Sequence, residues 1–513
     1  MNKNNLFLNS YQLILPLSTE ILIPKDDSVR MLVSVLDGID FGEEKKAYAK
    51  RSRKIPFVIL LRVVVYGFMR GIRSVRAIER ACRENINFMW LLSGYPVPDH
   101  NTIARFISAV DMNTVFVKVN KVLVELGEIK FEHGFVDGTK IEANANRYSF
   151  VWKGAVEKHK AKLLPKAETF LSETCKRYGI KFLTLEGLIN YLDGRKIESV
   201  FGKGKRKSDE QRDLETALEY AEKLRRYGKY IEIIGDNRKS MSKTDPDATF
   251  MRLKDDYMRN GQLKPAYNVQ LCVESEYITG FYVSADRNDS MTLKPFLEKQ
   301  ETEYGKRHKD LTLDAGYESE ENYAYLKDKE QTAYIKPFNY EQSKTRKYKR
   351  QIGRKENMSY DAALDQYTCA NGKKLNAVYK MTRKSNSGYE QNITIYRCDD
   401  CADCPSRALC TKAQEGKPKE IECSRAFEEY RAESLKNITS ELGIQLRVNR
   451  SIQVEGVFGI IKQDYLFRKF NRRGKREIST ELALVCTAYN LNKLHTNLIT
   501  GRTGFSLHEI SSA

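Results

Sequence analysis

Residues 267–283, YNVQLCVESEYITGFYV, form the segment of the sequence that decides the fold. Two runs rich in aromatic and β-branched residues are separated by the polar triplet Glu-Ser-Glu, which is typical of a β-hairpin. The pattern that follows predicts a helix over 290–304, a strand over 311–313, a helix over 318–327 and a strand over 332–335. This alternation of strands and helices predicts an α/β fold with a mixed sheet.

The sequence on either side of the hairpin divides the chain further. Apolar residues recur at helical spacing from residue 26 to about 126, which predicts an all-helical domain. The short apolar run Phe135-Val136 ends in Asp137-Gly138 and predicts a first strand that stops at a turn. We therefore expect a helical domain (1–126), a core in three parts (127–151, 256–336 and 446–513), a helical insertion (152–255) and a basic, Cys-rich insertion (337–445).

The composition favours a globular protein with a polyanionic partner. The chain has 513 residues, 41% of them hydrophobic, which is enough to build more than one core and excludes disorder for most of its length. Lysine and arginine number 87 against 68 acidic residues, a net charge of +19, so nucleic acid is the first candidate partner. The most apolar stretch, 55–69, is interrupted by Arg62 and is shorter than the ~20 residues of a membrane-spanning helix. We expect a cytoplasmic protein without a membrane partner.

Three carboxylates occupy positions at which this fold would bring them together. Asp137 and Asp314 follow predicted strands, Glu455 lies on a predicted helix, and strand ends converge where ligands bind in open α/β sheets. Clustered carboxylates repel one another, so they either keep a proton or hold hard cations such as Mg²⁺. Two Mg²⁺ ions would activate a water or a 3′-hydroxyl for displacement at phosphorus. Taken singly, each acid also fits an ordinary turn or an exposed helix position.

The segments around these acids resemble a known family. Residues 135–148 (FVDGTKIEANANRY), 313–317 (LDAGY) and 454–462 (VEGVFGIIK) are similar to the three catalytic blocks of bacterial insertion-sequence transposases with an RNase-H-like DDE domain. The resemblance extends over nearly the whole chain. It implies an RNase-H-like core with an N-terminal helical DNA-binding domain, two Mg²⁺ ions held by Asp137, Asp314 and Glu455, and Lys462 as a basic partner.

The resemblance also implies partners and a location. The DNA would be double-stranded and would comprise the element ends and the target. Because two ends must be brought together, a homodimer or larger assembly is implied. A protein of this kind would be associated with the nucleoid.

One part of the family pattern is altered. The wider group often has Tyr-x2-Arg-x3-Glu-x6-Lys, whereas here the two positions before Glu455 are Val448 and Ser451. Arg447 and Arg450 lie close by, but Arg450 is one residue out of register, so we predict both as phosphate contacts. The Glu-x6-Lys half is intact, and a spacing of seven places Glu455 and Lys462 on one helix face, where the lysine can hold a DNA phosphate.

The helical domain contains a candidate helix-turn-helix. Residues 74–85 and 99–106 are predicted as its two helices, with Asp99 capping the second. The resemblance to a family with an N-terminal DNA-binding region makes Asn101, Thr102 and Arg105 candidate DNA contacts. An ordinary helix pair is the alternative, because this motif has no strict signature.

Five of the ten cysteines crowd into 42 residues: Cys369, Cys398, Cys401, Cys404 and Cys410. A structural Zn²⁺ needs four thiolates, and the spacing also suits an Fe–S cluster or reduced, unliganded thiols. We predict Cys401, Cys404 and Cys410 as zinc ligands, with Cys398 and Cys369 competing for the fourth place. The isolated Cys residues are predicted as buried small apolar side chains.

These observations favour an enzyme, a DDE transposase that cleaves element ends in a metal-dependent reaction and joins them to target DNA. Two alternatives remain at the level of sequence. One is a DNA-binding protein descended from such an enzyme that no longer cuts, although none of its three acids is missing. The other is an RNase-H-like nuclease that cuts without joining.

Overall fold

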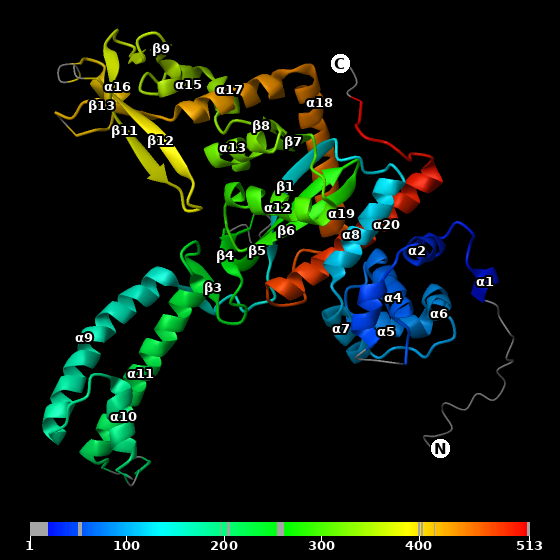
Figure 1. Ribbon diagram of the computed structural model, residues 1–513, viewed down its shortest axis with the longest axis horizontal. Coiled ribbons are helices and arrows are strands. Elements are labelled where there is room, and N and C mark those ends of the chain that lie inside the picture. The colour runs from blue at the N-terminus through cyan, green and yellow to red at the C-terminus, as the bar shows by residue number, and fades with distance from the viewer. Residues whose placement is uncertain are drawn as a thin grey trace.

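The computed structural model of the chain is drawn in Figure 1. It describes residues 19–49, 54–195, 197, 199–202, 206–253, 261–398, 401, 404–414 and 416–509. Among the helices within these ranges, none is long and apolar enough to cross a membrane.

The central sheet is mixed, as the sequence predicts. Its strands are β1 (His133–Glu142), β4 (Thr249–Arg252), β5 (Leu263–Glu274), β6 (Tyr277–Ser284), β7 (Asp310–Leu313) and β8 (Thr332–Ile335). They follow the order β4-β5-β1-β7-β8, and β6 pairs with β5. The hairpin β5–β6 and its partner β1 are antiparallel, whereas β1, β7 and β8 run parallel. The predicted hairpin and the predicted fold class are confirmed.

The register of β1 against β7 brings two of the predicted acids side by side. Val136 pairs with Leu313 in the last parallel pair, and Asp137 and Asp314 are the next residues of the two strands. The prediction that β1 ends at Asp137 is wrong, since β1 continues to Glu142. The reason is that β5 is twelve residues long and its ladder with β1 continues through Glu142, beyond the point where β7 stops.

Helices cover both faces of this sheet. One face carries α12 (Leu293–Tyr304), α13 (Glu320–Asp328) and the short helices η2 (Asp289–Met291) and η3 (Ala315–Tyr317). The other face carries α8 (Met112–Glu125), α18 (Glu441–Arg450), η5 (Ser451–Glu455), α19 (Gly456–Gln463) and α20 (Lys475–Thr500). Because α20 also packs against α4 and α8, the core of the sheet is continuous with that of the N-terminal helices.

The N-terminal region is helical, as predicted. Its helices before α8 are α1 (Thr19–Leu22), α2 (Ser28–Asp37), α3 (Gly42–Ala49), α4 (Phe57–Met69), α5 (Val75–Glu84), α6 (Ile86–Leu92) and α7 (His100–Ala109). Phe116 of α8 meets Phe281 of β6 edge to face, with ring centroids 5.3 Å apart. The helices and the sheet therefore share one hydrophobic core.

The first insertion forms an arm that projects from the sheet (Figure 1). A short ladder of β2 (Phe150–Trp152) and β3 (Ser240–Ser242) forms its base, followed outward by α9 (Lys153–Tyr178) and α11 (Asp209–Ile234), with α10 (Leu185–Asp193) packed at the far end. At 1.5 Å per residue, each 26-residue helix is about 39 Å long. The helical character of this insertion agrees with the sequence.

The second insertion contains a sheet that the sequence did not predict. Five antiparallel strands follow the order β13-β12-β11-β10-β9. Their bounds are β9 (Ser359–Asp361), β10 (Gln366–Thr368), β11 (Lys374–Lys384), β12 (Glu390–Cys398) and β13 (Lys419–Cys423), and the short helices are α14 (Tyr340–Ser343), α15 (Arg346–Lys349), η4 (Lys355–Asn357) and α16 (Arg407–Cys410). Nearly every residue of β11 is exposed, so an apolar alternation is missing there.

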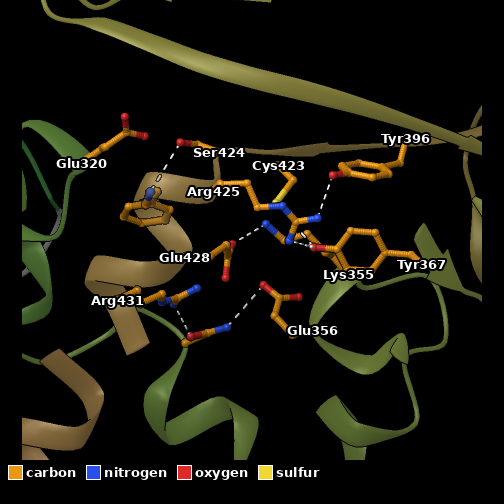
Figure 2. A network of polar contacts seen from close by, with 12 residues as sticks. Glu320, Lys355, Glu356, Tyr367, Tyr396, Cys423, Ser424, Arg425, Glu428 and Arg431 are labelled. Carbon is orange, nitrogen blue, oxygen red and sulfur yellow. Dashed lines mark hydrogen bonds and ion pairs between the residues drawn. The ribbon is translucent and has the colours of Figure 1, made fainter. Parts of the chain in front are cut away.

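Helix α17 (Arg425–Thr439) joins this second sheet to the central one. The Arg425 guanidinium donates to Asp365 Oδ1 at 2.8 Å. It also donates to the Tyr396 hydroxyl at 2.7 Å (Figure 2). Further along, α17 packs on β8 and α13, and Arg431 forms an ion pair with Glu318 at 2.9 Å. The Cys-rich insertion is thereby tied to the segment that follows Asp314.

Candidate active site

Asp137 lies opposite the helix that carries the predicted glutamate. Phe135 shares a hydrophobic core with Leu446 of α18 and Val454 of η5. Because residues two apart in a strand point to the same face, Asp137 faces this helix as well. Its Oδ2 lies 3.2 Å from Nη1 of Arg450, and its Oδ1 accepts a hydrogen bond from the Gly138 N–H at 2.8 Å.

Opposing electrostatic effects act on the pKa of the Asp137 carboxyl. Burial raises its pKa most strongly, Arg450 and the Gly138 N–H lower it, and the charges of Asp314 and Asp289 raise it again. The net effect is a pKa above the usual value. A carboxyl with this environment gains from a nearby positive charge, so the site suits a cation.

Asp314 follows β7 directly. It caps the short helix η3, and its Oδ1 accepts from the Gly316 N–H at 2.5 Å. The fully buried Tyr317 lies next to these acids, and burial together with the charges of Asp289, Asp137 and Asp314 raises its pKa. Tyr317 therefore remains a neutral hydrogen-bond donor.

The structure adds a carboxylate that the sequence reasoning missed. Asp289 begins η2, and its Oδ1 accepts from Asn268 Nδ2 at 2.7 Å and from Gln270 Nε2 at 3.1 Å. Asn268 and Gln270 are buried polar residues two apart on β5. Polar residues on one face of an otherwise apolar strand are a signal that could have revealed a buried partner.

A π-helical turn connects Arg450 to Glu455. The helix from α18 to α19 continues through η5, which is π-helical from Ser451 to Glu455. In a π-turn the hydrogen bonds link residues five apart, so one extra residue is accommodated within a turn. The five-residue spacing of Arg450 and Glu455 therefore replaces the four-residue spacing of the Arg-x3-Glu pattern.

This turn affects where Arg450 lies relative to Glu455. Because it accommodates one extra residue, Arg450 lies about one turn before Glu455 although five positions separate them. Arg450 also contacts Asp137. The roles of Arg447 and Arg450 as phosphate contacts stay predictions.

The predicted acids are not equally placed. Asp137, Asp314 and Asp289 approach one another, whereas Glu455 is exposed on the adjacent helix. Within the described part of the chain, no three Asp, Glu, His or Cys side chains are arranged as a metal site. The carboxylate oxygens of these acids are nevertheless the hard ligands that Mg²⁺ prefers. Gly138 and Gly316, which have no side chain, allow the carboxylates to approach one another.

The two glycines lie beside the acids in space as well as in sequence. A Cβ at Gly138 would lie 2.9 Å from Asp289 Oδ1, and a Cβ at Gly316 would lie 2.9 Å from Asp314 Oδ1 and 3.2 Å from Asp289 Oδ2. The two distances of 2.9 Å are shorter than real Cβ contacts, and the distance of 3.2 Å is tight. The absence of side chains at these positions is what lets the carboxylates come close.

The remaining residues of the catalytic helix lie where the helix periodicity places them. Lys462 lies two turns after Glu455 on α19. The Arg447 guanidinium lies 5.6 Å from the centroid of the Tyr340 ring, and its Nε is buried without a hydrogen-bond partner. Arg447 thus has hydrogen-bonding capacity left for a ligand.

The predicted helix-turn-helix differs from expectation in one respect. Asp99 caps α7 by accepting from the Thr102 N–H at 2.6 Å, as predicted, but α6 lies between α5 and α7. The sequence interpretation assigned no helix to the apolar run 86–92, which forms a helix of its own. The motif is therefore three helices in which α5 and α7 contact each other.

A carboxylate fixes α5 against α7. Glu79 of α5 accepts from the His100 N–H at 3.0 Å, and its hydrogen bonds with Arg83 and His100 lower its pKa to about 2. On α7, Asn101 and Arg105 are exposed and Thr102 is half-buried. The exposed side chains leave this face of α7 accessible to a ligand.

The Cys cluster forms one pocket lined by Cys369, Cys398, Cys401, Cys404 and Cys410. Burial raises the pKa of the Cys410 thiol, Lys419 lowers it, and Cys401, Cys369 and Cys404 raise it. Cys398 ends β12 and belongs to the apolar cluster of this sheet. Cys369, one of the two competitors for the fourth place, acts on the pKa of Cys410, and both competitors line the pocket.

Two family models match the chain. Residues 368–495 match the transposase DDE domain, and residues 17–109 match a transposase domain (DUF772). The first match includes the Cys cluster, Glu455 and Lys462, and the second includes α7. A search of curated proteins found no match.

Both matched domains are transposase domains, and the fold is the mixed α/β fold that the resemblance implies. The chain is thus a transposase of the insertion-sequence type with a DDE domain. Transposases of this class act on DNA with divalent metal ions.

Proposed function

We propose that this transposase binds the ends of its mobile element, cleaves them to expose 3′-hydroxyls and joins these to target DNA. Asp137, Asp314 and Glu455 are the proposed metal-binding acids. The observation that carries the proposal is the register of β1 and β7, which puts Asp137 and Asp314 side by side directly beyond their last parallel pair.

The proposed site has the ligand chemistry for Mg²⁺. When bound, two such ions would activate the attacking oxygen and stabilise the leaving oxygen at phosphorus. Asp137 and Asp314 supply oxygens from the sheet, and Glu455 supplies one from the exposed face of the catalytic helix. Its exposure leaves Glu455 free to orient toward DNA and metal together.

The basic residues of the same helix have a separate role in the proposal. Arg450 balances the buried charge of Asp137 and presents its remaining N–H groups to a phosphate. Arg447 and Lys462 extend the phosphate contacts along the helix. On α7, Asn101, Thr102 and Arg105 are the proposed contacts to the element end, and synapsis of two ends requires a homodimer or a larger assembly.

Substitution of the acids tests the catalytic part. We expect Asp137→Asn, Asp314→Asn and Glu455→Gln to bind end DNA but to lose cleavage and strand transfer in Mg²⁺. Glu441→Gln, an exposed change on α18, is the matched control and should cleave normally. Normal cleavage by one of the three variants would remove that residue, and a wild-type chain that binds ends without nicking under any divalent ion would identify a silent DNA-binding protein.

We further propose that the Cys pocket holds a structural Zn²⁺. Cys401, Cys404 and Cys410 are the proposed ligands, with Cys369 or Cys398 as the fourth, because all five thiols line one pocket. Four thiolates are the usual ligand set of structural zinc. The zinc would stabilise the second sheet locally, since metal binding there is linked to folding of that segment.

Metal analysis tests the zinc proposal. We expect one zinc per purified chain and a loss of zinc in Cys410→Ser. Of Cys369→Ser and Cys398→Ser, the variant that also loses zinc identifies the fourth ligand. A wild-type protein that contains no zinc and no iron would refute the site.

A further inference from the structure

The loop between β6 and α12 brings an additional carboxylate to the site. Asp289 approaches the central sheet at Gly138, the residue after Asp137, and at Gly316, two residues after Asp314. The negative charge of Asp289 acts on Asp137 together with that of Asp314. Its place beside both acids calls for an explanation, because a third negative charge opposes the first two.

Three buried side chains hold the Asp289 carboxylate in one orientation. Asn268 and Gln270 donate to Oδ1, Gln270 Nε2 also donates to Asn268 Oδ1 at 3.0 Å, and the Tyr317 hydroxyl donates to Gln270 Oε1. Both N–H groups of the Gln270 amide are therefore used. These contacts fix Oδ1 and the plane of the carboxylate.

The second oxygen of Asp289 points to the catalytic acids. Oδ2 and Asp314 Oδ1 both border the space that a side chain at Gly316 would fill. A purely structural aspartate is expected to have hydrogen bonds at both oxygens. Here the donors converge on Oδ1, and Oδ2 borders the space shared with Asp314.

We propose that Asp289 is a further ligand of the divalent metal in this site, binding through Oδ2. The inference rests on the proposed metal-dependent function. Asp137, Asp314 and Asp289 bring three negative charges against the single nearby cation Arg450, and a divalent ion would offset the excess. The side-chain amides of Asn268 and Gln270 hydrogen-bond to Asp289 and would orient its carboxylate toward the metal.

Metal affinity tests this inference without reference to catalysis. Mn²⁺ binding to the full chain is measured by calorimetry and by the loss of the free Mn²⁺ EPR signal. Asp289→Asn keeps an oxygen to accept from Asn268 and Gln270, so the fold should be preserved. We expect it to weaken Mn²⁺ binding by about tenfold to a hundredfold.

Asp286→Asn is the matched control. Asp286 lies in the same loop, its Oδ2 accepts from Ser284 Oγ at 3.0 Å, and the substitution makes the same change in charge. It should bind Mn²⁺ as the wild type does. Asn268→Ala, which removes a donor to Asp289 and leaves the acids intact, should also weaken binding and keeps the test valid if Asp289→Asn is unstable.

Two outcomes separate this inference from the proposed function. If Asp137→Asn and Asp314→Asn lose Mn²⁺ binding but Asp289→Asn and Asn268→Ala retain it, the role of Asp289 is refuted and the function stands. If Asp137→Asn and Asp314→Asn cleave normally, the function itself is refuted.

Discussion

At the scale of single residues, the fold holds negatively charged carboxylates close together despite their mutual repulsion. Asp137 is buried beside Asp314 and Asp289, and Arg450 is its ion-pair partner. Burial and the two neighbouring charges keep its pKa raised. This state predicts a measurable dependence of stability on pH.

The raised pKa of Asp137 determines the sign of this dependence. Between the ordinary value of 3.8 and the raised value, the folded chain holds a proton that the unfolded chain has released. The free energy of unfolding contributed by this group therefore falls as the pH rises through that window. Asp137→Asn carries no such proton, so its stability should depend less on pH there.

Urea denaturation in metal-free buffer, from about pH 4 to about pH 7, measures the effect as the difference between wild type and variant. Titrating groups that do not interact with Asp137 contribute equally to both proteins. Parallel profiles would show that Asp137 has an ordinary pKa.

Gly138 permits a second residue-level prediction. In Gly138→Ala the new Cβ would lie 2.5 Å from Gln270 Nε2 and 2.9 Å from Asp289 Oδ1. We expect a loss of about 1–3 kcal/mol in the free energy of unfolding, because a packed site must shift. The control is Gly154→Ala in α9, where a Cβ would have no neighbour within 4 Å. This substitution should slightly stabilise the helix. Equal stability of the two variants would contradict the close approach of Asp289.

The sequence identified Asp137 and Asp314 because each follows a predicted strand in a recognisable segment. It did not identify Asp289, because Asn288-Asp289-Ser290 looks like the start of an ordinary helix. Asp289 differs from an ordinary helix-start residue by its contacts with Asn268 and Gln270, which lie about twenty residues earlier, on β5. Only the folded chain brings these together.

At the scale of elements, the π-turn explains how the catalytic helix tolerates an extra residue. Arg450 contacts Asp137 although it is one residue out of register with the family pattern. A sequence count assumes 3.6 residues per turn throughout and therefore does not allow for the extra residue between Arg450 and Glu455. The local widening of the helix cannot be detected from such a count.

Deletion of one residue tests this explanation. Ile452 lies within the π-turn and is 44% exposed, so its deletion should convert the turn to α-helix and keep Arg450 and Glu455 on one face. We expect the variant to retain its melting temperature and DNA cleavage. Deletion of Ile460, 38% exposed within the regular helix α19, should instead rotate Lys462 and lower both. Equal damage by the two deletions would refute the role of the π-turn.

The second sheet shows where element prediction fails. β11 has only one buried residue, so its sequence lacks the alternation that reveals a strand. It is a strand because its backbone pairs with β10 and β12. By contrast, the hairpin of β5 and β6 is buried on both faces, and its boundaries were predicted within a few residues.

At the scale of the whole molecule, Arg425 joins the Cys-rich sheet to the core. Its guanidinium contacts Asp365 and Tyr396 and lies 3.7 Å from the centroid of the Tyr360 ring. Arg425 is the first residue of α17, and the same helix packs on β8 further along (Figure 1). Loss of this side chain should therefore loosen one sheet more than the other.

We expect Arg425→Ala to cost about 1–3 kcal/mol in local stability, because it removes charged hydrogen bonds. Hydrogen exchange should increase in β10 and β12 and change little in β1 and β5. Arg383→Ala is the control, since the exposed Arg383–Glu422 ion pair contributes less than about 1 kcal/mol. Uniform exchange across both sheets would show that Arg425 does not act as a local link.

The continuous hydrophobic core under α4, α8, α20 and the central sheet has a consequence for how DNA is cut. Within the described residues, the proposed end-binding helix α7 and the strand β1 that carries Asp137 contribute side chains to the same hydrophobic core, so we expect them to move together. The distance between the recognised base pairs and the scissile phosphate is then a fixed property of the fold. Each element end should be cut at a constant offset from its recognition sequence, and inserting a half-turn of DNA between the two should abolish cutting while leaving binding intact.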